Sequence, residues 1–346
     1  MKILSIDTSC DETAAAVTED IKILSNIVWS QASAHAKFGG VMPTLAKRMH
    51  EERIDFVIDR AMTNAKCQMT NIDAVAVTIG PGLSIALRVG VEKAKELAIK
   101  YSKKLIAVNH LEGHILSPLA RPNNPISQLT NKPINFPALG LVVSGGNTQL
   151  ILIKGIGKYE ILAQTTDDAL GEALDKAARM LGLGYPGGAI LEKMAKPGDS
   201  KIYKLPVPLV GQEKRMLFTY SGLKSAMMRL IEKEKPLTKE KIQNLAASFQ
   251  NVAFQHITRV VSYLINHSTN QPFSHLLVGG GVAANVELRK RLRKLGKEFN
   301  IKIHFPYSNK LYGDNAAMIG IAAYFKAQRG EFIDSDKIDR NPNLKI

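Results

Sequence analysis

Short runs of apolar residues alternate with segments of helical pattern along most of the chain. The runs have the length and composition of buried strands, and Gly, Asp, Asn or Ser stands at many of their ends. Alternation of strands and helices is typical of α/β proteins whose central strands are largely parallel. The runs that predict this fold class are KILSID, AAAVTE, DAVAVTIG, KLIAVN, ALGLVVS, TQLILI, SHLLVGGG and IKIHFP.

A weak internal repeat relates two strand-turn-strand units. Residues 3–17, ILSIDTSCDETAAAV, align with residues 139–153, LGLVVSGGNTQLILI, so that Asp11 falls opposite Asn147. The small residues in both turns let backbone amides approach an anion. The repeat predicts a duplicated, two-lobe fold with facing phosphate loops. The lobe boundary is expected in residues 121–137, where Pro and Asn concentrate, although a polar surface loop explains that composition equally well.

Length and composition narrow the class of protein. A chain of 346 residues is long enough for two domains with a substantial core. Two cysteines make no disulfide framework, MKILSID lacks signal-peptide character, and no apolar run approaches about 18 residues. We therefore expect a cytoplasmic protein that does not enter a membrane. The net charge of +15 favours a polyanionic partner such as nucleic acid, and a general basic bias is the alternative.

The segment VNHLEGHILS, residues 108–117, holds two histidines four positions apart. On a helix His110 and His114 lie on nearly one face, so both can bind one metal ion, or they are simply structural. In the peptidase motif H-E-x-x-H the glutamate directly follows the first histidine and acts as general base. Here Glu112 lies about 200° round the helix from His110 and points away from the metal face. The order of residues argues against a peptidase and leaves a metal site open.

A third metal ligand must come from another part of the chain. Asp314, in LYGDNAAMIGIAAYF, stands at an expected helix start, where the simpler explanation is an N-cap. If Asp314 faces His110 and His114, two imidazoles and one carboxylate with open positions suit Fe2+ and also Zn2+. Asn109 follows an expected strand and can cap the helix that begins with His110.

Two glycine-rich turns stand between an expected strand and an expected helix. GPGL at 80–83 either cradles a phosphate or only turns a corner before the helix LSIALRVGVEKAKELAIKY. VGGGVAANVELRKRL at 278–292 leaves space for a flat ring or a phosphate, with Asn285 as a hydrogen-bond donor. Both turns are candidates for nucleotide contact.

Two further expected helices carry polar residues whose function the sequence does not decide. In DDALGEALDKAARMLGLGYPGGAILEKMA a polar stripe can grip ribose hydroxyls beside two glycines, or it is a solvated helix face followed by a C-cap. In ELRKRLRKLGKEF three leucines share one side, and the basic residues elsewhere either bind phosphates or face solvent. The stripe comprises Glu172, Asp175 and Arg179, and the leucines are Leu288, Leu292 and Leu295.

Taken together, nine sequence blocks resemble the tRNA N6-adenosine threonylcarbamoyltransferase family, and its bacterial branch most closely. They occur in family order from residue 5 to about residue 325, so the resemblance covers nearly the whole chain. The blocks are SIDTSCDETAAAV, FGGVMPTLAKRMH, GPGL, NHLEGH, VVSGGNTQL, GEALDKAARMLGLGYPGG, FTYSGLK, GGGVAANVELR and DNAAMIG.

The resemblance implies an actin-like, Hsp70-like fold of the ASKHA class with two duplicated lobes, mixed central sheets and an active site in the interlobe cleft. The N-terminal lobe would span residues 1–130, joined by a C-terminal segment of about 325–346, and the C-terminal lobe residues 131–324. The resemblance also implies one divalent metal ion, Fe2+ in preference to Zn2+, held by His110, His114 and Asp314. It implies that threonylcarbamoyl-AMP is contacted by Val142, Val143, Ser144, Gly145, Gly146, Asp175, Gly188, Glu192 and Asn285.

The implied reaction moves the threonylcarbamoyl group from threonylcarbamoyl-AMP to N6 of the adenosine 3′ of the anticodon, in tRNAs that read ANN codons. Adenine amines are weak nucleophiles, so positioning matters. Asp11, at the tip of the first loop, is our candidate for the group that orients the amine or accepts its proton. The target base lies in the anticodon loop, where it can be splayed out without melting a duplex. Other partners implied are a TsaB-like paralogue and a TsaE-like ATPase.

Two positions depart from the family pattern. Thr44 stands where the family usually has Glu, and Val142 stands where archaeal and eukaryotic relatives carry a Tyr metal ligand. Water or substrate should therefore complete the coordination sphere. The competing hypotheses are an actin-like small-metabolite phosphotransferase, a metallopeptidase and a non-catalytic tRNA-binding scaffold.

Overall fold

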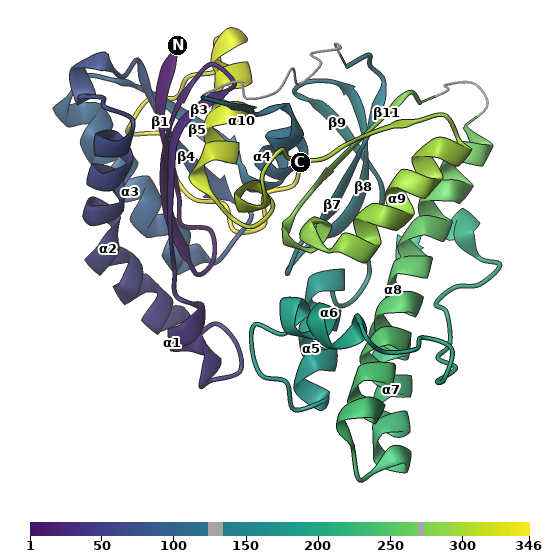
Figure 1. Cartoon of the computed structure of the whole chain (residues 1–346). Coiled ribbons are helices and arrows are strands. Elements are labelled where there is room, and N and C mark those ends of the chain that lie inside the picture. Colours follow the sequence, from purple (N-terminus) through teal and green to yellow (C-terminus); the bar gives the residue numbers. More distant parts are fainter. Residues whose placement is uncertain (124–133, 269–272) are drawn as a thin grey trace. The chain divides into compact units, whose positions relative to one another are not determined.

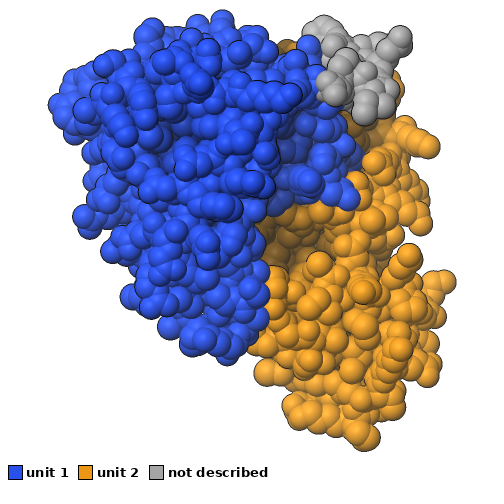
Figure 2. Space-filling view, turned by 60° about the vertical axis from the view of Figure 1, so that its left-hand side comes forward, with its two compact units in different colours: residues 1–133, 156–158, 305–346 blue, residues 134–155, 159–304 orange. Residues whose placement is uncertain are grey.

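The computed structural model describes residues 1–123, 134–268 and 273–346. By contacts the chain divides into unit 1, residues 1–133, 156–158 and 305–346, and unit 2, residues 134–155 and 159–304, coloured separately in Figure 2. The lobe limits expected from the sequence stay a prediction, and they differ from the units mainly in residues 305–324. Most of the expected boundary segment, 121–137, lies outside the described residues.

Unit 1 contains a mixed six-stranded sheet in the order β5-β4-β1-β2-β3-β6. The first three strands follow one another and pair antiparallel, whereas β4 and β5 join β1 in parallel pairing. The strands are β1 Lys2–Asp7, β2 Glu12–Glu19, β3 Lys22–Ser30, β4 Ala74–Gly80, β5 Lys104–Asn109 and β6 Arg121–Pro122. The helices are α1 Ala32–Ala36, α2 Pro43–Asn64, α3 Ser84–Lys100, α4 His110–Leu116 and α10 Ala316–Gln328.

Helices cover both faces of this sheet (Figure 1). Helices α2 and α3 contact β2 and β4, and their apolar residues form one core with Leu4 and Ile6 of β1. Helix α10 contacts β1, β2 and β3 and packs beside α4. Because side chains alternate along a strand, Ser5 and Asp7 point to the face opposite Leu4 and Ile6. There the Ser5 hydroxyl donates to the Ala316 carbonyl oxygen at 2.6 Å, so the end of β1 meets the start of α10.

Unit 2 repeats this arrangement of strands. Its sheet has the order β10-β9-β8-β7-β11-β12, in which β7 pairs antiparallel with β8 and parallel with β11. The strands are β7 Ala138–Val143, β8 Thr148–Gly155, β9 Lys158–Thr165, β10 Leu217–Phe218, β11 His275–Gly279 and β12 Lys302–His304. The helices are α5 Leu170–Met180, α6 Gly188–Ala195, α7 Ser221–Glu234, α8 Lys239–His267 and α9 Val286–Glu298.

The two sheets have corresponding strand orders, with β7, β8, β9, β11 and β12 in the places of β1, β2, β3, β4 and β5. The predicted α/β class with duplicated, mixed sheets is confirmed. The sequence prediction missed β3 and β9, the third strand of each unit. Their residues are mostly half-buried or exposed, so neither strand forms the continuous apolar run that marks a fully buried strand.

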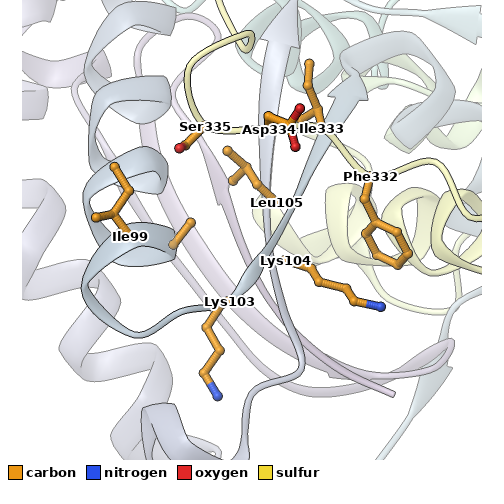
Figure 3. A pocket seen from close by; sticks show the side chains of 9 residues that line it. Ile99, Lys103, Lys104, Leu105, Phe332, Ile333, Asp334 and Ser335 are labelled. Carbon is orange, nitrogen blue, oxygen red and sulfur yellow. The ribbon is translucent and has the colours of Figure 1, made fainter.

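The expected helices over 83–101 and 287–299 are present as α3 and α9, and the three leucines of α9 are buried. In the part of the chain that the structure describes, no helix combines the length and apolar character needed to span a membrane. A cavity of about 320 Å³ lies between the end of α3, the start of β5 and residues 332–335, where Lys104 approaches the ring of Phe332 (Figure 3). It adjoins the start of β5, whereas His110 follows the end of that strand.

Gly320 allows α10 to pack closely on the sheet, and this contact can be tested by a matched pair of substitutions. A Cβ at Gly320 would lie 2.7 Å from Thr18 Oγ1 and 2.8 Å from its Cγ2, whereas Gly222 of α7 has open space. We expect Gly320→Ala to destabilise the protein by about 1 to 3 kcal/mol through overpacking. Gly222→Ala should be neutral or stabilise by up to about 1 kcal/mol, because alanine favours helices. Urea titration of both variants checks this, and equal stabilities would contradict the packing.

Candidate metal centre and substrate-binding residues

The helix that carries both histidines begins where β5 ends. The Asn109 side-chain oxygen accepts hydrogen bonds from the backbone N–H groups of Leu111, at 2.8 Å, and Glu112, at 3.4 Å. The predicted cap is therefore confirmed, and it places His110 in the first turn of α4. Every residue of α4 is buried, so both imidazoles lie inside unit 1.

His110, His114 and Asp314 come together in unit 1 although about 200 residues separate the helix from the aspartate. One Asp314 oxygen lies 3.4 Å from His110 Nε2 and 3.2 Å from His114 Nε2. The imidazole rings are 4.7 Å apart at 82°, and one potential ligand atom of each residue lies within 4.8 Å of the others. Two imidazoles and one carboxylate in this arrangement can hold a divalent transition-metal ion.

The charges of the site favour a cation. Burial lowers the pKa of His110, but the Asp314 and Asp7 carboxylates outweigh it and raise that pKa to about 10. At His114 the effect of burial outweighs that of the Asp314 carboxylate, so the pKa of this imidazole is lowered. Burial would raise the pKa of Asp314, yet the two histidines hold it far below its usual range. The carboxylates of Asp7 and Asp314 thus favour positive charge at this position, which a bound metal ion would supply.

Asp314 is not the N-cap of α10. That cap is Asn315, whose side-chain oxygen accepts from the Met318 N–H at 3.1 Å, while its amide donates to the Gly313 carbonyl oxygen. The simpler explanation of Asp314 from sequence is thus wrong, since the neighbouring residue performs that task. The Asp314 carboxylate is left to face the histidines.

Glu112 lies on the other side of α4, as helix geometry predicts. It is 4% exposed, and one of its oxygens is 3.9 Å from Nη2 of Arg329 at the end of α10. It is not one of the three residues whose ligand atoms converge among the described residues. A general base beside a metal-bound water, as a peptidase requires, is therefore missing at this position.

Asp11 lies in the loop between β1 and β2 and is nearly buried at 9% exposure. Burial raises the pKa of the Cys10 thiol, and the nearby Asp11 carboxylate adds to this effect. Burial and the Asp314 carboxylate raise the pKa of the Glu12 carboxyl. His50 supports the loop, with Nε2 3.0 Å from the Cys10 carbonyl oxygen and Nδ1 2.8 Å from Thr13 Oγ1. Sequence reasoning overlooked Glu12 and His50, although both stand in sequence blocks that carry the family resemblance.

In unit 2 the loop after β7 closes on itself and on α5. The Ser144 N–H donates to the Asn147 carbonyl oxygen at 2.8 Å, and the carbonyl oxygens of Ser144 and Gly145 accept from the first turn of α5. A Cβ at Gly145 or Gly146 would meet nothing within 4 Å, so the loop has open space beside it. The side chains of Val142 and Val143 are buried in β7. These two valines can therefore offer a ligand only their backbone, and Val142 supplies no metal-binding atom.

The other predicted substrate residues of unit 2 are joined by hydrogen bonds to helix starts. One Asp175 oxygen accepts from the N–H groups of Gly187, at 2.8 Å, and Gly188, at 2.7 Å. One Glu192 oxygen accepts from the Val286 N–H at 2.8 Å. Asn285 caps α9, and its amide donates to Gln250 Oε1 at 2.9 Å. Asn285 thus caps α9 through its side-chain oxygen and donates to Gln250 through its amide. No sequence pattern pointed to Gln250 as a partner of Asn285.

A cavity of about 380 Å³ adjoins this group in unit 2. Glu192, Gln250 and Val286 line it, together with polar residues such as Ser200, Asn251 and Arg291. One glycine in each of the two glycine-rich turns, Gly82 in unit 1 and Gly280 in unit 2, is required for packing. A Cβ at Gly280 would collide with the Val143 carbonyl oxygen, and one at Gly82 with the Ser9 carbonyl oxygen. These two glycines of the expected phosphate turns thus permit close approach of backbone to backbone.

A family model described as tRNA N6-adenosine threonylcarbamoyltransferase matches residues 22–321. The chain belongs to this family. The protein of that name from Bartonella tribocorum is 45% identical over 355 residues, covering 99% of this chain and 94% of the relative. That from Caldicellulosiruptor bescii is 45% identical over 334 residues, covering 95% and 94%. The predicted family and enzyme class are confirmed, and the phosphotransferase, peptidase and scaffold hypotheses are not favoured.

Solved structures of low sequence identity share the fold. Full-length HypF aligns with a TM-score of 0.56 at 14% identity, over 95% of this chain and 55% of that chain. Component A of the (R)-2-hydroxyglutaryl-CoA dehydratase of Acidaminococcus fermentans aligns with a TM-score of 0.54 at 14% identity, over 95% and 99%. With the two corresponding sheets, these likenesses confirm the actin-like fold expected of a threonylcarbamoyltransferase of this family.

Metal retention tests the three-residue site directly. We expect the double substitution His110→Ala and His114→Ala to weaken metal binding by more than about 100-fold, because loss of an outer-shell partner alone costs 10- to 100-fold. Elemental analysis after dialysis against a weak chelator measures this. His267→Gln is the matched control, since that exposed imidazole stacks on Tyr263 within α8 and lies 2.8 Å from its carbonyl oxygen. Full metal occupancy in the double variant would place the site elsewhere.

Proposed function

We propose that this chain transfers the threonylcarbamoyl group from threonylcarbamoyl-AMP to N6 of the adenosine 3′ of the anticodon, in tRNAs that read ANN codons. The N6 nitrogen bonds to the carbamoyl carbon, the bond from that carbon to the AMP phosphate oxygen breaks, and N6 loses a proton. The products are N6-threonylcarbamoyladenosine and AMP. The observation that carries the proposal is the meeting of His110, His114 and Asp314 in a chain of this family.

The residues of unit 1 handle the reacting group. His110, His114 and Asp314 would hold the metal ion, with Fe2+ favoured over Zn2+. When bound, that ion supplies Lewis-acid polarisation of the threonylcarbamoyl group. Burial of both imidazoles keeps bulk water from the ligand atoms and so strengthens electrostatic interactions there. Water or substrate would complete the coordination sphere of such an ion, since only three residues would hold it.

Asp11 is the group we assign to the attacking amine. Its carboxylate lies in a nearly buried loop beside Cys10 and Glu12, and burial raises the pKa of both of these neighbouring side chains. The His50 ring fixes the backbone of this loop at Cys10. A carboxylate held in this way can orient an amine and accept its proton.

The residues of unit 2 bind the adenylate part of the donor. Asp175, Glu192 and Asn285 each accept hydrogen bonds from backbone N–H groups at a helix start. Carboxylate and amide groups of this kind also bind ribose hydroxyls or a base. Gly145 and Gly146 offer backbone beside open space, which suits a phosphate. Ser144 and Gly188 belong to the same set, and Val142 and Val143 contribute through their backbone alone.

The tRNA contacts basic surface, and α9 is our candidate for part of it. Four exposed basic residues, Lys290, Arg293, Lys294 and Lys297, follow one another at helical spacing opposite the buried leucines. Like charges four positions apart repel, and tRNA phosphates would relieve that repulsion. We further propose a TsaB-like paralogue and a TsaE-like ATPase as partner proteins and a cytoplasmic location.

Reconstitution tests the whole proposal. The chain is combined with threonine, bicarbonate, ATP, the adenylate-forming enzyme, the partner proteins and tRNA, and the nucleosides are analysed by mass spectrometry. We expect threonylcarbamoyladenosine at the anticodon-adjacent adenosine. Absence of the modified nucleoside while a related family member converts the same tRNA would refute the function.

Substitution of Asp11 tests its role. We expect Asp11→Asn to slow single-turnover transfer from threonylcarbamoyl-AMP by about 100- to 10,000-fold, because an amide cannot accept the proton. Metal retention should be unchanged. Asp20→Asn is the control, since the half-exposed Asp20 side chain pairs with the N-terminal ammonium at 2.8 Å. Wild-type transfer by Asp11→Asn would remove this residue from the mechanism.

Neutralising α9 tests the RNA surface. The triple substitution of Lys290, Lys294 and Lys297 by Gln should weaken tRNA binding and lower the slope of log affinity against log salt by about 2 to 3, as phosphate contacts are lost. The control triple, Lys66, Lys100 and Lys104 to Gln, removes the same charge from exposed positions of unit 1. If both triples change the slope equally, α9 has no specific part in tRNA binding. Rates at saturating tRNA should stay near wild type in the α9 variant.

A further inference from the structure

A buried carboxylate stands behind one of the metal-binding histidines. We infer that Asp7 is a positioning residue, which orients His110 through Nδ1 and selects the imidazole tautomer that binds a metal ion through Nε2. The inference rests on the metal-ligand set proposed above and concerns a residue outside that set.

Asp7 ends β1 and its side chain is inaccessible to solvent. Its Oδ1 accepts from the Ser9 N–H at 3.2 Å. Its Oδ2 lies 3.6 Å from His110 Nδ1, and within the described residues both atoms are buried without a hydrogen-bond partner. Buried polar atoms are rarely left unpaired, so two such atoms facing each other indicate a paired state.

Asp7 is not itself one of the metal ligands. His110 turns Nε2 toward Asp314, at 3.4 Å, and Nδ1 toward Asp7, so the two carboxylates approach different edges of one ring. Among the described residues, the convergent group contains His110, His114 and Asp314 and does not include Asp7. The carboxylate of Asp7 therefore acts on the metal site through the imidazole.

The chemistry of imidazole explains what Asp7 does. A neutral histidine that gives the Nε2 lone pair to a metal ion carries its proton on Nδ1. That proton needs an acceptor in a buried site, and Asp7 Oδ2 is placed to be it. The distance of 3.6 Å exceeds an ordinary N–H···O bond by about 0.5 Å, so the two side chains must move closer by that amount for the bond to form.

The substitution Asp7→Asn keeps the size of the side chain and removes one hydrogen-bond acceptor, so it separates this role from simple filling of space. Asp7 has two oxygens, one for the Ser9 N–H and one for His110. Asparagine has one oxygen, so either Ser9 or His110 faces an amide NH₂ instead of an acceptor. An NH₂ group that donates to Nδ1 stabilises the tautomer with hydrogen on Nε2, which cannot bind metal there. A similar exchange of tautomer follows loss of the orienting aspartate in serine proteases.

Metal affinity provides the test, with Zn2+ as the probe and a chromophoric chelator as competitor, in the absence of tRNA and adenylate. We expect Asp7→Asn to weaken zinc binding by about 10- to 100-fold. Asp7→Glu keeps a carboxylate and should lose less affinity than Asp7→Asn. Thr8→Val is the matched control: Thr8 is equally buried, but its hydroxyl donates to the Ala86 carbonyl oxygen of α3 at 2.9 Å. Equal affinities for Asp7→Asn and Thr8→Val would overturn the inference.

A measurement on the unmodified protein covers the case in which Asp7→Asn does not fold. Long-range ¹H–¹⁵N spectra of the ¹⁵N-histidine-labelled, zinc-loaded chain should show His110 protonated at Nδ1 and metal-bound at Nε2. A metal-bound Nδ1 would overturn the inference. If the His110 and His114 double variant keeps its metal, the ligand set itself fails. If only Asp7→Asn behaves as wild type, the ligand set stands and Asp7 has no positioning role.

Discussion

The interaction on which unit 1 depends is the placing of two carboxylates, the buried Asp7 and the partly exposed Asp314, beside the imidazoles of α4. A buried anion is costly unless a positive charge or hydrogen-bond donors compensate it. His110 lies between the two carboxylates and turns one ring nitrogen toward each. The end of β1, the start of α4 and the start of α10 must therefore meet. Caps at Asn109 and Asn315 set where both helices begin, and Gly320 lets α10 approach the sheet.

Duplication has produced two units of the same topology and different chemistry. In unit 1 the loop after the first strand is surrounded by acidic residues and histidines. In unit 2 the corresponding loop, Ser144–Asn147, is small and closes onto the first turn of α5. There the polar side chains of Asp175, Glu192 and Asn285 bind backbone N–H groups. The same framework thus presents acid and imidazole groups in one unit and backbone-linked polar groups in the other.

Much of the fold could be predicted because its central strands are continuous apolar runs, as in ALGLVV of β7, where every residue is buried. Strands β3 and β9 escaped prediction because only part of each is buried, which weakens the pattern. The sequence left open whether the glycines in GPGL and VGGG contact a phosphate or only turn the chain. In the structure Gly82 and Gly280 allow two backbones to approach, a need that depends on neighbours distant in sequence and leaves no local signal.

The sequence by itself determined the local geometry of the candidate site. Helical spacing placed His110 and His114 together and turned Glu112 away, and the residue before the helix was a suitable cap. The tertiary structure decided that Asp314 faces these histidines while Asn315 caps α10, and that Asp7 stands behind His110. The physical reason is the distance along the chain over which each effect acts. Helical periodicity and capping involve residues that are only a few positions apart. Contacts between residues 7, 110 and 314 depend on strand register and helix packing across the whole unit.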